Sequence, residues 1–380
     1  KARALGFGED YGRYAPEIMA AKAGRFGLLQ KDALSYAYHI DATSYAGLLR
    51  QQAEKDGVTR IEGKIVDVHQ SESGDISAVV LESGQAVKGD LFIDCSGFVS
   101  LLMDKALGTD FEDWTHWLPC DRAIAVQTTA VSEPVPYTRS IARESGWQWR
   151  IPLQNRVGNG LVYCSEFISD DEARSTLLGN LEGEVITEPR VLRFRTGQRV
   201  KHWNRNCVAL GLAAGFLEPL ESTSIHLIQR GVIRLLQMFP YGGIVESDRT
   251  EFNRQMDTEF RTIRDFIIMH YHVTERTDTG FWRRCRDMDV PDSLRHRLDL
   301  FRDSGRVFEA EGDIFRENSW TQVMLGQGIE PQSYHAIVDM MDEKELRQFI
   351  QILGQKVDHV LKQLPTHQEF INRYCPSAAA

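Results

Sequence analysis

The chain has 380 residues, of which 42% are hydrophobic, so it can fill the core of one large domain or two ordinary ones. Its formal net charge of -10 opposes binding to polyanions and excludes nucleic acid as an expected partner. Six cysteines without close pairing predict reduced thiols, and no apolar run is typical of a membrane span or a signal peptide. We therefore expect a globular cytoplasmic enzyme with no membrane partner.

The first part of the chain predicts a helix followed by a β-meander. Residues 1–35 contain five glycines without a clear period, which indicates loop and short helix. A helix is expected from an N-cap at Asp41 to about Gly57, with an apolar face made by Tyr45, Leu48, Leu49 and Ala53. The period then changes to two, which predicts strands over 61–68, 76–81 and 86–94.

The last of these strands ends in the small residues Asp94-Cys95-Ser96-Gly97. Small residues at the end of a parallel strand leave backbone N–H groups free to face a ligand, which we expect here. Further along, short alternating segments over 122–131, 137–142, 147–153 and 161–167 predict an antiparallel sheet that forms one wall of a substrate site.

The second part of the chain predicts another buried strand and then mainly helices. Residues 207–212 form the strand, and after the loop 215–221 a helix is expected with apolar positions Ile225, Ile228, Val232, Leu235 and Leu236. From about residue 241 the helical period dominates, with one face made by Phe252, Met256, Phe260, Ile263, Phe266 and Ile267. We therefore divide the chain into residues 1–240 and a mainly helical part, residues 241–380. Histidines without carboxylate or cysteine neighbours at ligand spacing predict no metal site.

Two segments carry the chemistry. Residues 146–153 read Gly-Trp-Gln-Trp-Arg-Ile-Pro-Leu, and indoles at i and i+2 share one face of a strand, which by itself is typical of core packing. Residues 216–226 read Phe-Leu-Glu-Pro-Leu-Glu-Ser-Thr-Ser-Ile-His at a strand-to-helix junction. Unpaired N–H groups and the helix dipole favour an anion at such a junction, although an ordinary N-cap at Ser222 or Thr223 is the alternative.

These two segments, together with His270-Tyr271 and Phe281-Trp282, resemble the flavin-dependent halogenases of the tryptophan/indole type. The resemblance implies an α/β fold of the FAD-dependent monooxygenase kind, with glutathione-reductase-type FAD binding, an antiparallel substrate sheet and a helical C-terminal part. Residues 1–240 would then form the FAD-binding and substrate-sheet portion. In this fold a GxGxxG turn holds the FAD pyrophosphate, and Gly6-Phe7-Gly8 does not match it. We therefore expect the sequence to begin inside a longer protein, and these 380 residues alone to bind FAD poorly.

The resemblance also assigns roles to individual residues. Glu221 is implied as the catalytic carboxylate beside the substrate, and the backbone N–H groups of Thr223 and Ser224 as the halide site. Ser224 stands where many members of the family have glycine, so the preference between chloride and bromide stays open. Trp147 and Trp149 would separate the flavin from the substrate. The residues implied to bind FAD are Val66, Ser96, Gly97, Leu212, Ala213 and Ile225.

The function implied by the resemblance is halogenation of an electron-rich aromatic ring through a flavin hydroperoxide and hypohalous acid. FADH2 would come from a separate flavin reductase, because the sequence shows no second dinucleotide fingerprint. The segment Asn318–Val323 lacks the adjacent tyrosines of free-tryptophan enzymes, so indole or an indole derivative is as good a candidate as tryptophan. A homodimer is compatible with this interpretation.

Two other classes of function remain open. One is an FAD-dependent aromatic hydroxylase, although those enzymes usually carry Gly-Asp-Ala where this chain has Gly211-Leu212-Ala213. The other is a non-catalytic protein that binds FAD or another ligand.

Overall fold

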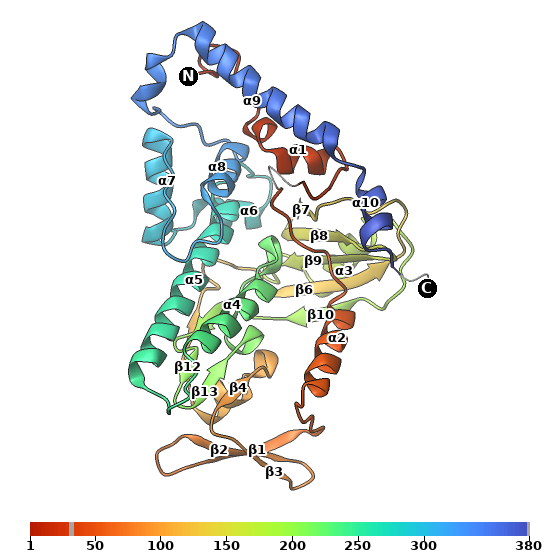
Figure 1. Cartoon of the computed structure of the whole chain (residues 1–380), viewed down its shortest axis with the longest axis vertical. Coiled ribbons are helices and arrows are strands. Elements are labelled where there is room, and N and C mark those ends of the chain that lie inside the picture. Colours follow the sequence, from red (N-terminus) through yellow and green to blue (C-terminus); the bar gives the residue numbers. More distant parts are fainter. Residues whose placement is uncertain (30–33, 378–380) are drawn as a thin grey trace.

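The computed structural model describes residues 1–29 and 34–377 and shows a mixed α/β fold (Figure 1). Its helices are α1 (Pro16–Lys22), α2 (Ala42–Lys55), α3 (Asp170–Leu178), α4 (Ser224–Gln237), α5 (Glu246–His272), α6 (Gly280–Asp287), α7 (Asp292–Ser304), α8 (Glu317–Gly326), α9 (Glu343–Gln363) and α10 (His367–Tyr374). Its strands are β1 (Ile65–Gln70), β2 (Ile76–Leu81), β3 (Ala86–Lys88), β4 (Phe92–Asp94), β5 (Phe111–Asp113), β6 (Arg122–Thr128), β7 (Arg139–Arg143), β8 (Gly146–Pro152), β9 (Val157–Tyr163), β10 (Arg190–Arg193), β11 (Gly197–Arg199), β12 (Trp203–Asn204), β13 (Cys207–Ala209) and β14 (Gly215–Phe216).

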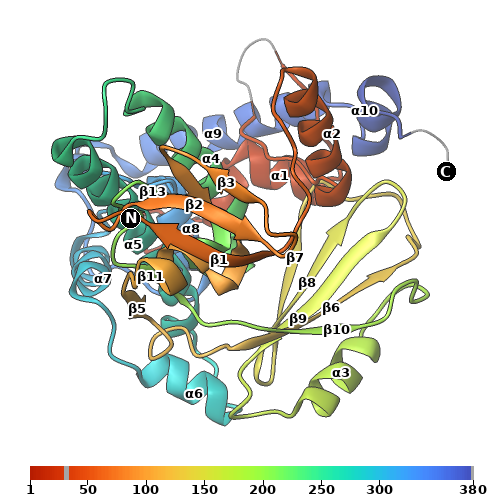
Figure 2. The same cartoon turned by 90° about the horizontal axis from the view of Figure 1, so that it is seen from below.

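The described strands form four sheets. The predicted meander is the antiparallel sheet β1-β2-β3, which projects at the lower end of the molecule in Figure 1. The predicted antiparallel sheet has the order β10-β6-β9-β8-β7. It lies above the meander in Figure 1 and to the right of it in Figure 2, where the molecule is seen from below. Strands β4 and β13 pair in parallel within the sheet β12-β13-β4, and the order of the fourth sheet is β14-β11-β5. The parallel pair confirms that the strand before Cys95 is of the parallel type.

Most predicted elements are present, with shifted ends. Helix α2 follows the predicted N-cap, where the Asp41 carboxylate accepts hydrogen bonds from the backbone N–H groups of Thr43 and Ser44. The predicted strand over 86–94 is divided between β3 and β4, which belong to different sheets, so that prediction was wrong in its bounds. Strand β10 was missed, because its four residues, Arg-Val-Leu-Arg, do not alternate between apolar and polar as a half-buried strand does.

The two faces of the five-stranded sheet have different coverings. Helix α3 packs on one face through a small cluster made by Ile124, Val126, Leu161, Tyr163, Ala173 and Leu177. On the opposite face, Trp147 and Val162 belong to the main hydrophobic core. Successive side chains of a strand point to opposite faces, so Trp147 and Trp149 both lie on the core face. This face is therefore the one that can meet the loop before α4.

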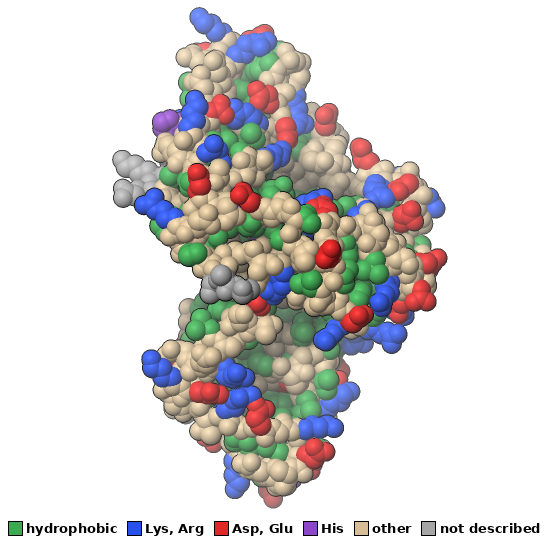
Figure 3. Space-filling view, turned by 90° about the vertical axis from the view of Figure 1, so that its right-hand side faces the viewer, with side chains coloured by type: hydrophobic (Ala, Val, Ile, Leu, Met, Phe, Trp, Pro, Cys, Tyr) green, Lys and Arg blue, Asp and Glu red, His purple; other side chains and the backbone are tan. Residues whose placement is uncertain are grey.

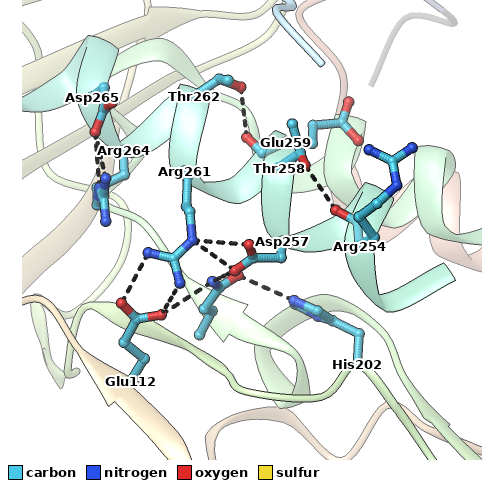
Figure 4. Close-up of polar contacts among 11 residues, drawn as sticks. Glu112, His202, Arg254, Asp257, Thr258, Glu259, Arg261, Thr262, Arg264 and Asp265 are labelled. Atoms are coloured by element: carbon cyan, nitrogen blue, oxygen red, sulfur yellow. Dashed lines mark hydrogen bonds and ion pairs between the residues drawn. The ribbon is translucent and has the colours of Figure 1, made fainter. Parts of the chain in front are cut away.

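Helix α5 is the central helix of the predicted helical part, and its predicted apolar face is buried. Its polar side is also fixed. Arg261 donates to both Glu112, at 2.6 Å, and Asp257, at 2.8 Å (Figure 4). The Gln198 amide nitrogen donates to the Asp257 carboxylate, and its amide oxygen accepts from Nε2–H of His202 at 3.1 Å. These contacts attach α5 to β5 and β11. At the top of Figure 1, α9 crosses α1.

The buried face of helix α4 differs from the predicted apolar face. Its buried residues are Leu227, Gly231, Arg234 and Leu235, whereas the apolar positions Ile225, Ile228, Val232 and Leu236 are exposed. At Gly231 a Cβ atom would come too close to Leu210, so the backbone of α4 approaches the loop after β13 along this side. The period identified the helix correctly, but close packing at the glycine decides which side is buried.

The main hydrophobic core contains residues from Ile76 to Met324, and it therefore includes side chains on both sides of position 240. The division at this position remains a prediction.

Within residues 1–29 and 34–377, no helix has the length and apolar content that crossing a membrane requires. Figure 3 shows one face of the molecule, where hydrophobic side chains reach the surface among acidic and basic ones. The exposed apolar residues of α2 are Tyr45, Leu48 and Leu49.

Candidate functional site

The loops that follow the parallel strands β4 and β13 are held together by hydrogen bonds. The backbone N–H of Leu210 donates to the carbonyl of Asp94 at 3.0 Å, and the Ser100 hydroxyl donates to the carbonyl of Ala213 at 3.1 Å. The buried Asp94 carboxylate accepts from the N–H groups of Leu102 and Met103 at 2.8 and 2.9 Å. The two loop segments predicted to bind a cofactor are therefore brought to one edge of the sheet, as expected for strand ends.

Two cavities open beside these loops. One cavity, of about 300 Å³, is lined by Phe98, Phe111, Phe194, Phe216, Leu212 and three arginines. The other, of 240 Å³, lies between the loop after β13 and α4, with Leu212 and Ser224 in its walls. Leu212 lines both cavities. Aromatic rings and arginines in one wall can bind a flat aromatic, anionic molecule.

The other predicted cofactor residues lie in different surroundings. Ser96 is exposed and Gly97 is partly exposed at the end of β4, while Ala213 is buried. Val66 on β1 and Ile225 on α4 are exposed and line neither cavity. The structure thus brings together the residues of the two loops, and it leaves Val66 in a separate sheet.

The backbone that leads into the N-terminus of α4 is strained at Ser222. The short 3₁₀ turn Pro219–Glu221 ends at Ser222, whose φ of +56° lies in the left-handed region that non-glycine residues rarely adopt. Thr223 follows as the N-cap, is buried, and makes no side-chain capping hydrogen bond. An ordinary side-chain cap is therefore absent at Thr223, and the first-turn N–H groups of the 14-residue helix can face an anion.

Glu221 contacts a histidine that the sequence analysis gave no role. The Nε2 atom of His270 lies 3.0 Å from Oε1 of Glu221, and its Nδ1 atom lies 2.8 Å from the carbonyl oxygen of Phe266. A carbonyl oxygen only accepts, so Nδ1 carries a hydrogen. The contact with Glu221 consequently also needs a proton, either on Nε2 or on the carboxyl group. The sequence offered one indication of this histidine, because His270-Tyr271 is among the segments that resemble the halogenases.

Trp147 and Trp149 lie side by side on β8, with ring centroids 6.0 Å apart. The Trp147 indole is buried, and its Nε1–H donates to Oε2 of Glu218 at 2.8 Å. The Tyr271 hydroxyl donates to the same oxygen. Burial raises the pKa of Glu218 to about 7, although the hydrogen bonds from Tyr271 and Trp147 act in the opposite direction. Sequence reasoning missed this carboxyl group, because nothing in the local pattern distinguishes it from the support of a turn.

The segment Asn318–Val323 lies within α8, and its tryptophan is a core residue. Trp320 is buried, with its ring at an edge-to-face angle to Phe266 and its Nε1–H donating to the carbonyl of Phe315. Asn318 accepts a hydrogen bond from Tyr11. This tryptophan therefore cannot contact a ligand without leaving the core.

Comparisons with known proteins identify the family of the chain. The family model described as tryptophan halogenase matches residues 1–343. The solved flavin-dependent halogenase Xcc4156 from Xanthomonas campestris is 53% identical, with a TM-score of 0.98, over all of this chain and 77% of its own chain. BrvH, a flavin-dependent halogenase from Brevundimonas sp. BAL3, is 41% identical with a TM-score of 0.94, over 97% of this chain and 77% of its own.

The tryptophan 6-halogenase ThaL from Streptomyces albogriseolus is 37% identical over 334 residues, which make up 83% of this chain and 62% of that protein. The chain therefore spans less than two thirds of the length of this relative.

Proposed function

The chain belongs to the tryptophan halogenase family, and from this premise we propose that the protein carrying it halogenates an electron-rich aromatic ring in a reaction that depends on FADH2. One observation carries the proposal furthest. The hydrogen bond from Trp147 to Glu218 joins the two segments that the family resemblance singled out, although 71 positions separate them in the sequence. This contact supports the proposal that the tryptophan pair and the loop with Glu221 belong to one site.

The described residues fit a flavin at the carboxyl ends of β4 and β13, as in the proposed glutathione-reductase-type fold. Phe98 and Leu212 are exposed beside these strand ends, and a flat ring system would cover them. We propose that Ser96, Gly97 and the backbone around Ala213 contact the cofactor, with Val66 and Ile225 at its edges. Reduced FAD, when bound, would supply the electrons that activate oxygen for oxidation of the halide.

We propose that the N-terminus of α4 binds the chloride or bromide ion. The N–H groups of Thr223 and Ser224 stand at the positive end of the helix dipole, and the Thr223 side chain does not cap them. Glu221, in contact with His270, would stabilise positive charge that develops on the oxidant or the ring. A proton shared with His270 would keep this carboxyl group in place.

Trp147 and Trp149 would then form a wall between the flavin and the aromatic substrate. Both rings lie on the core face of the sheet, and the Trp147 indole is fixed by Glu218. We propose indole or a tryptophan or indole derivative as the substrate, because the segment Asn318–Val323 lacks the adjacent tyrosines of free-tryptophan enzymes. The proposal also includes a separate flavin reductase as a transient partner; a homodimer is a further expectation.

The test is a reaction with the full-length protein, a flavin reductase, oxygen, bromide and either indole or tryptophan. Mass spectrometry should detect a brominated product, whose two bromine isotopes distinguish it from any hydroxylated product. The relative yields with indole and with tryptophan then identify the preferred substrate. A product that gains only oxygen would favour the hydroxylase, and the absence of any brominated product would refute the proposal.

A further inference from the structure

Glu218 is a buried carboxyl group between the two segments on which the proposed function depends. Its side chain is 0% exposed, and its Oε2 atom accepts hydrogen bonds from the Trp147 indole at 2.8 Å and from the Tyr271 hydroxyl. Within the described part of the chain, its Oε1 atom has no hydrogen-bond partner. Both donors therefore converge on one oxygen, and they connect the loop before α4 with the five-stranded sheet and with α5.

A carboxyl group in this position is costly. Burial raises its pKa to about 7, which means that the surroundings disfavour the charged form. A loop that needed only packing could place an apolar side chain of similar size here without that penalty. The presence of the carboxyl group is better explained by the two donors that it holds than by support of the turn at Pro219.

The contacts of Glu218 also bear on Glu221. The two glutamates lie at the ends of one short turn, and they contact consecutive residues of α5, since Glu218 bonds Tyr271 while Glu221 contacts His270. The loop is thus attached to the last turn of α5 at two points. Through its second donor, Glu218 adds the Trp147 indole to the same unit, so that indole and the Glu221 carboxyl group are held in a fixed relation.

We propose that Glu218 is a positioning residue that sets the Trp147 indole relative to Glu221, so that flavin oxidation stays coupled to halogenation. This inference rests on the proposed function. Glu218 acts through Trp147, and it is not a catalytic residue, because it is enclosed by protein side chains. Displacement of a site group by about 1 Å can lower a rate on the order of 100-fold, so a loosened indole should be measurable.

The experiment compares three single variants of the full-length protein, Glu218→Met, Glu218→Gln and Trp147→Phe. It also includes the double variant that combines Glu218→Met with Trp147→Phe. Methionine keeps the length of the side chain and removes both acceptors, whereas glutamine keeps one oxygen for the two donors. Asp265→Asn is the control, since Asp265 is also a buried carboxylate of the core, bound by Arg264 and Ser293. For each variant we would measure brominated product per reoxidised flavin, and the melting temperature.

Glu218→Met should lower the product per reoxidised flavin about 10-fold or more, while flavin reoxidation continues. Glu218→Gln should retain most of the wild-type product per reoxidised flavin, because glutamine keeps one acceptor oxygen. Asp265→Asn should change only the melting temperature. In the Trp147→Phe background, Glu218→Met should have little further effect on the ratio. A second readout needs no cofactor. The Trp147 indole N–H resonance can be assigned by its loss in Trp147→Phe, and this resonance should shift in Glu218→Met but not in Asp265→Asn.

The failures can be told apart. A wild-type protein that forms no brominated product overturns the proposed function and this inference with it. An active wild type whose product ratio is unchanged in Glu218→Met, with a lower melting temperature, overturns only the inference and leaves Glu218 a structural residue. An unshifted Trp147 resonance in Glu218→Met would also overturn it.

Discussion

Replacing Glu218 by glutamine should stabilise the fold increasingly as the pH rises from about 4.5 to about 7. An unfolded glutamate ionises near 4.5, whereas burial raises the pKa of Glu218 in the folded protein to about 7. Between these values the folded state retains a proton that the unfolded state loses. The wild type therefore has a favourable contribution below pH 4.5 that is lost as the pH approaches 7. Glutamine cannot ionise and has no such loss.

The size of the effect follows from the shift. A rise from 4.5 to about 7 corresponds to about 3 kcal/mol, because one pKa unit is about 1.4 kcal/mol. The nearby Cys120, Cys285 and Tyr271 have pKa values raised mainly by burial, so they stay neutral over this window. The unpartnered amide of glutamine adds an offset that does not change with pH. The slope of the difference in free energy of unfolding therefore reports on Glu218.

Chemical denaturation of both proteins between about pH 5 and pH 8 measures this slope. The matched control is Glu112→Gln. Burial opposes ionisation of Glu112, but the hydrogen bonds that Arg261 and Gln198 donate to its carboxylate lower its pKa. The difference in free energy of unfolding between Glu112→Gln and the wild type should therefore be constant over this range. Parallel stability curves for the wild type and Glu218→Gln would show that the buried carboxyl group is not perturbed and would refute the reasoning.

Three further predictions concern the site and its support. Glu221→Gln should lower halogenated product per reoxidised flavin by about 10²–10³-fold while flavin reoxidation survives, and near-normal product would remove Glu221 from the mechanism. Glu259→Gln leaves the buried Arg234 without its charged partner and should cost about 3–5 kcal/mol in denaturation experiments; a loss below about 1 kcal/mol would contradict this. Gly160→Ala should cost about 1–3 kcal/mol, because a Cβ atom there would overlap the ring of the neighbouring tryptophan, whereas Gly158→Ala meets its nearest atom only at 3.8 Å. Equal melting temperatures for the two alanine variants would contradict the packing argument.

Local patterns in the sequence predicted much of the fold. The cap at Asp41, the meander and the buried face of α5 follow from turn chemistry and periodicity, which involve neighbouring residues only. The strand-to-helix junction before α4 was predicted in the same way. The family resemblance then pointed to Trp147 and Glu221, whose roles remain proposals, although a tryptophan pair on a strand is by itself typical of core packing.

The buried face of α4 shows where periodicity stops being informative. An apolar stripe predicts which residues share a side of the helix, but a second element decides which side is covered. Here Gly231 allows the helix to approach Leu210 closely, and Arg234 is buried because Glu259 of α5 binds it. Neither partner can be identified from the spacing of residues within α4.

The two glutamates of the loop before α4 make the same point about the site. Both precede the helix within one short turn, so sequence reasoning could treat Glu218 as support for the turn and Glu221 as the reactive group. The structure places Glu218 among apolar side chains with two neutral donors, and it leaves Glu221 partly exposed beside His270. Identical side chains three positions apart thus have different electrostatic surroundings, and these are set by α5 and β8. A carboxyl group enclosed in this way can hold neighbouring groups in place, whereas a partly exposed one beside a histidine can act on a substrate.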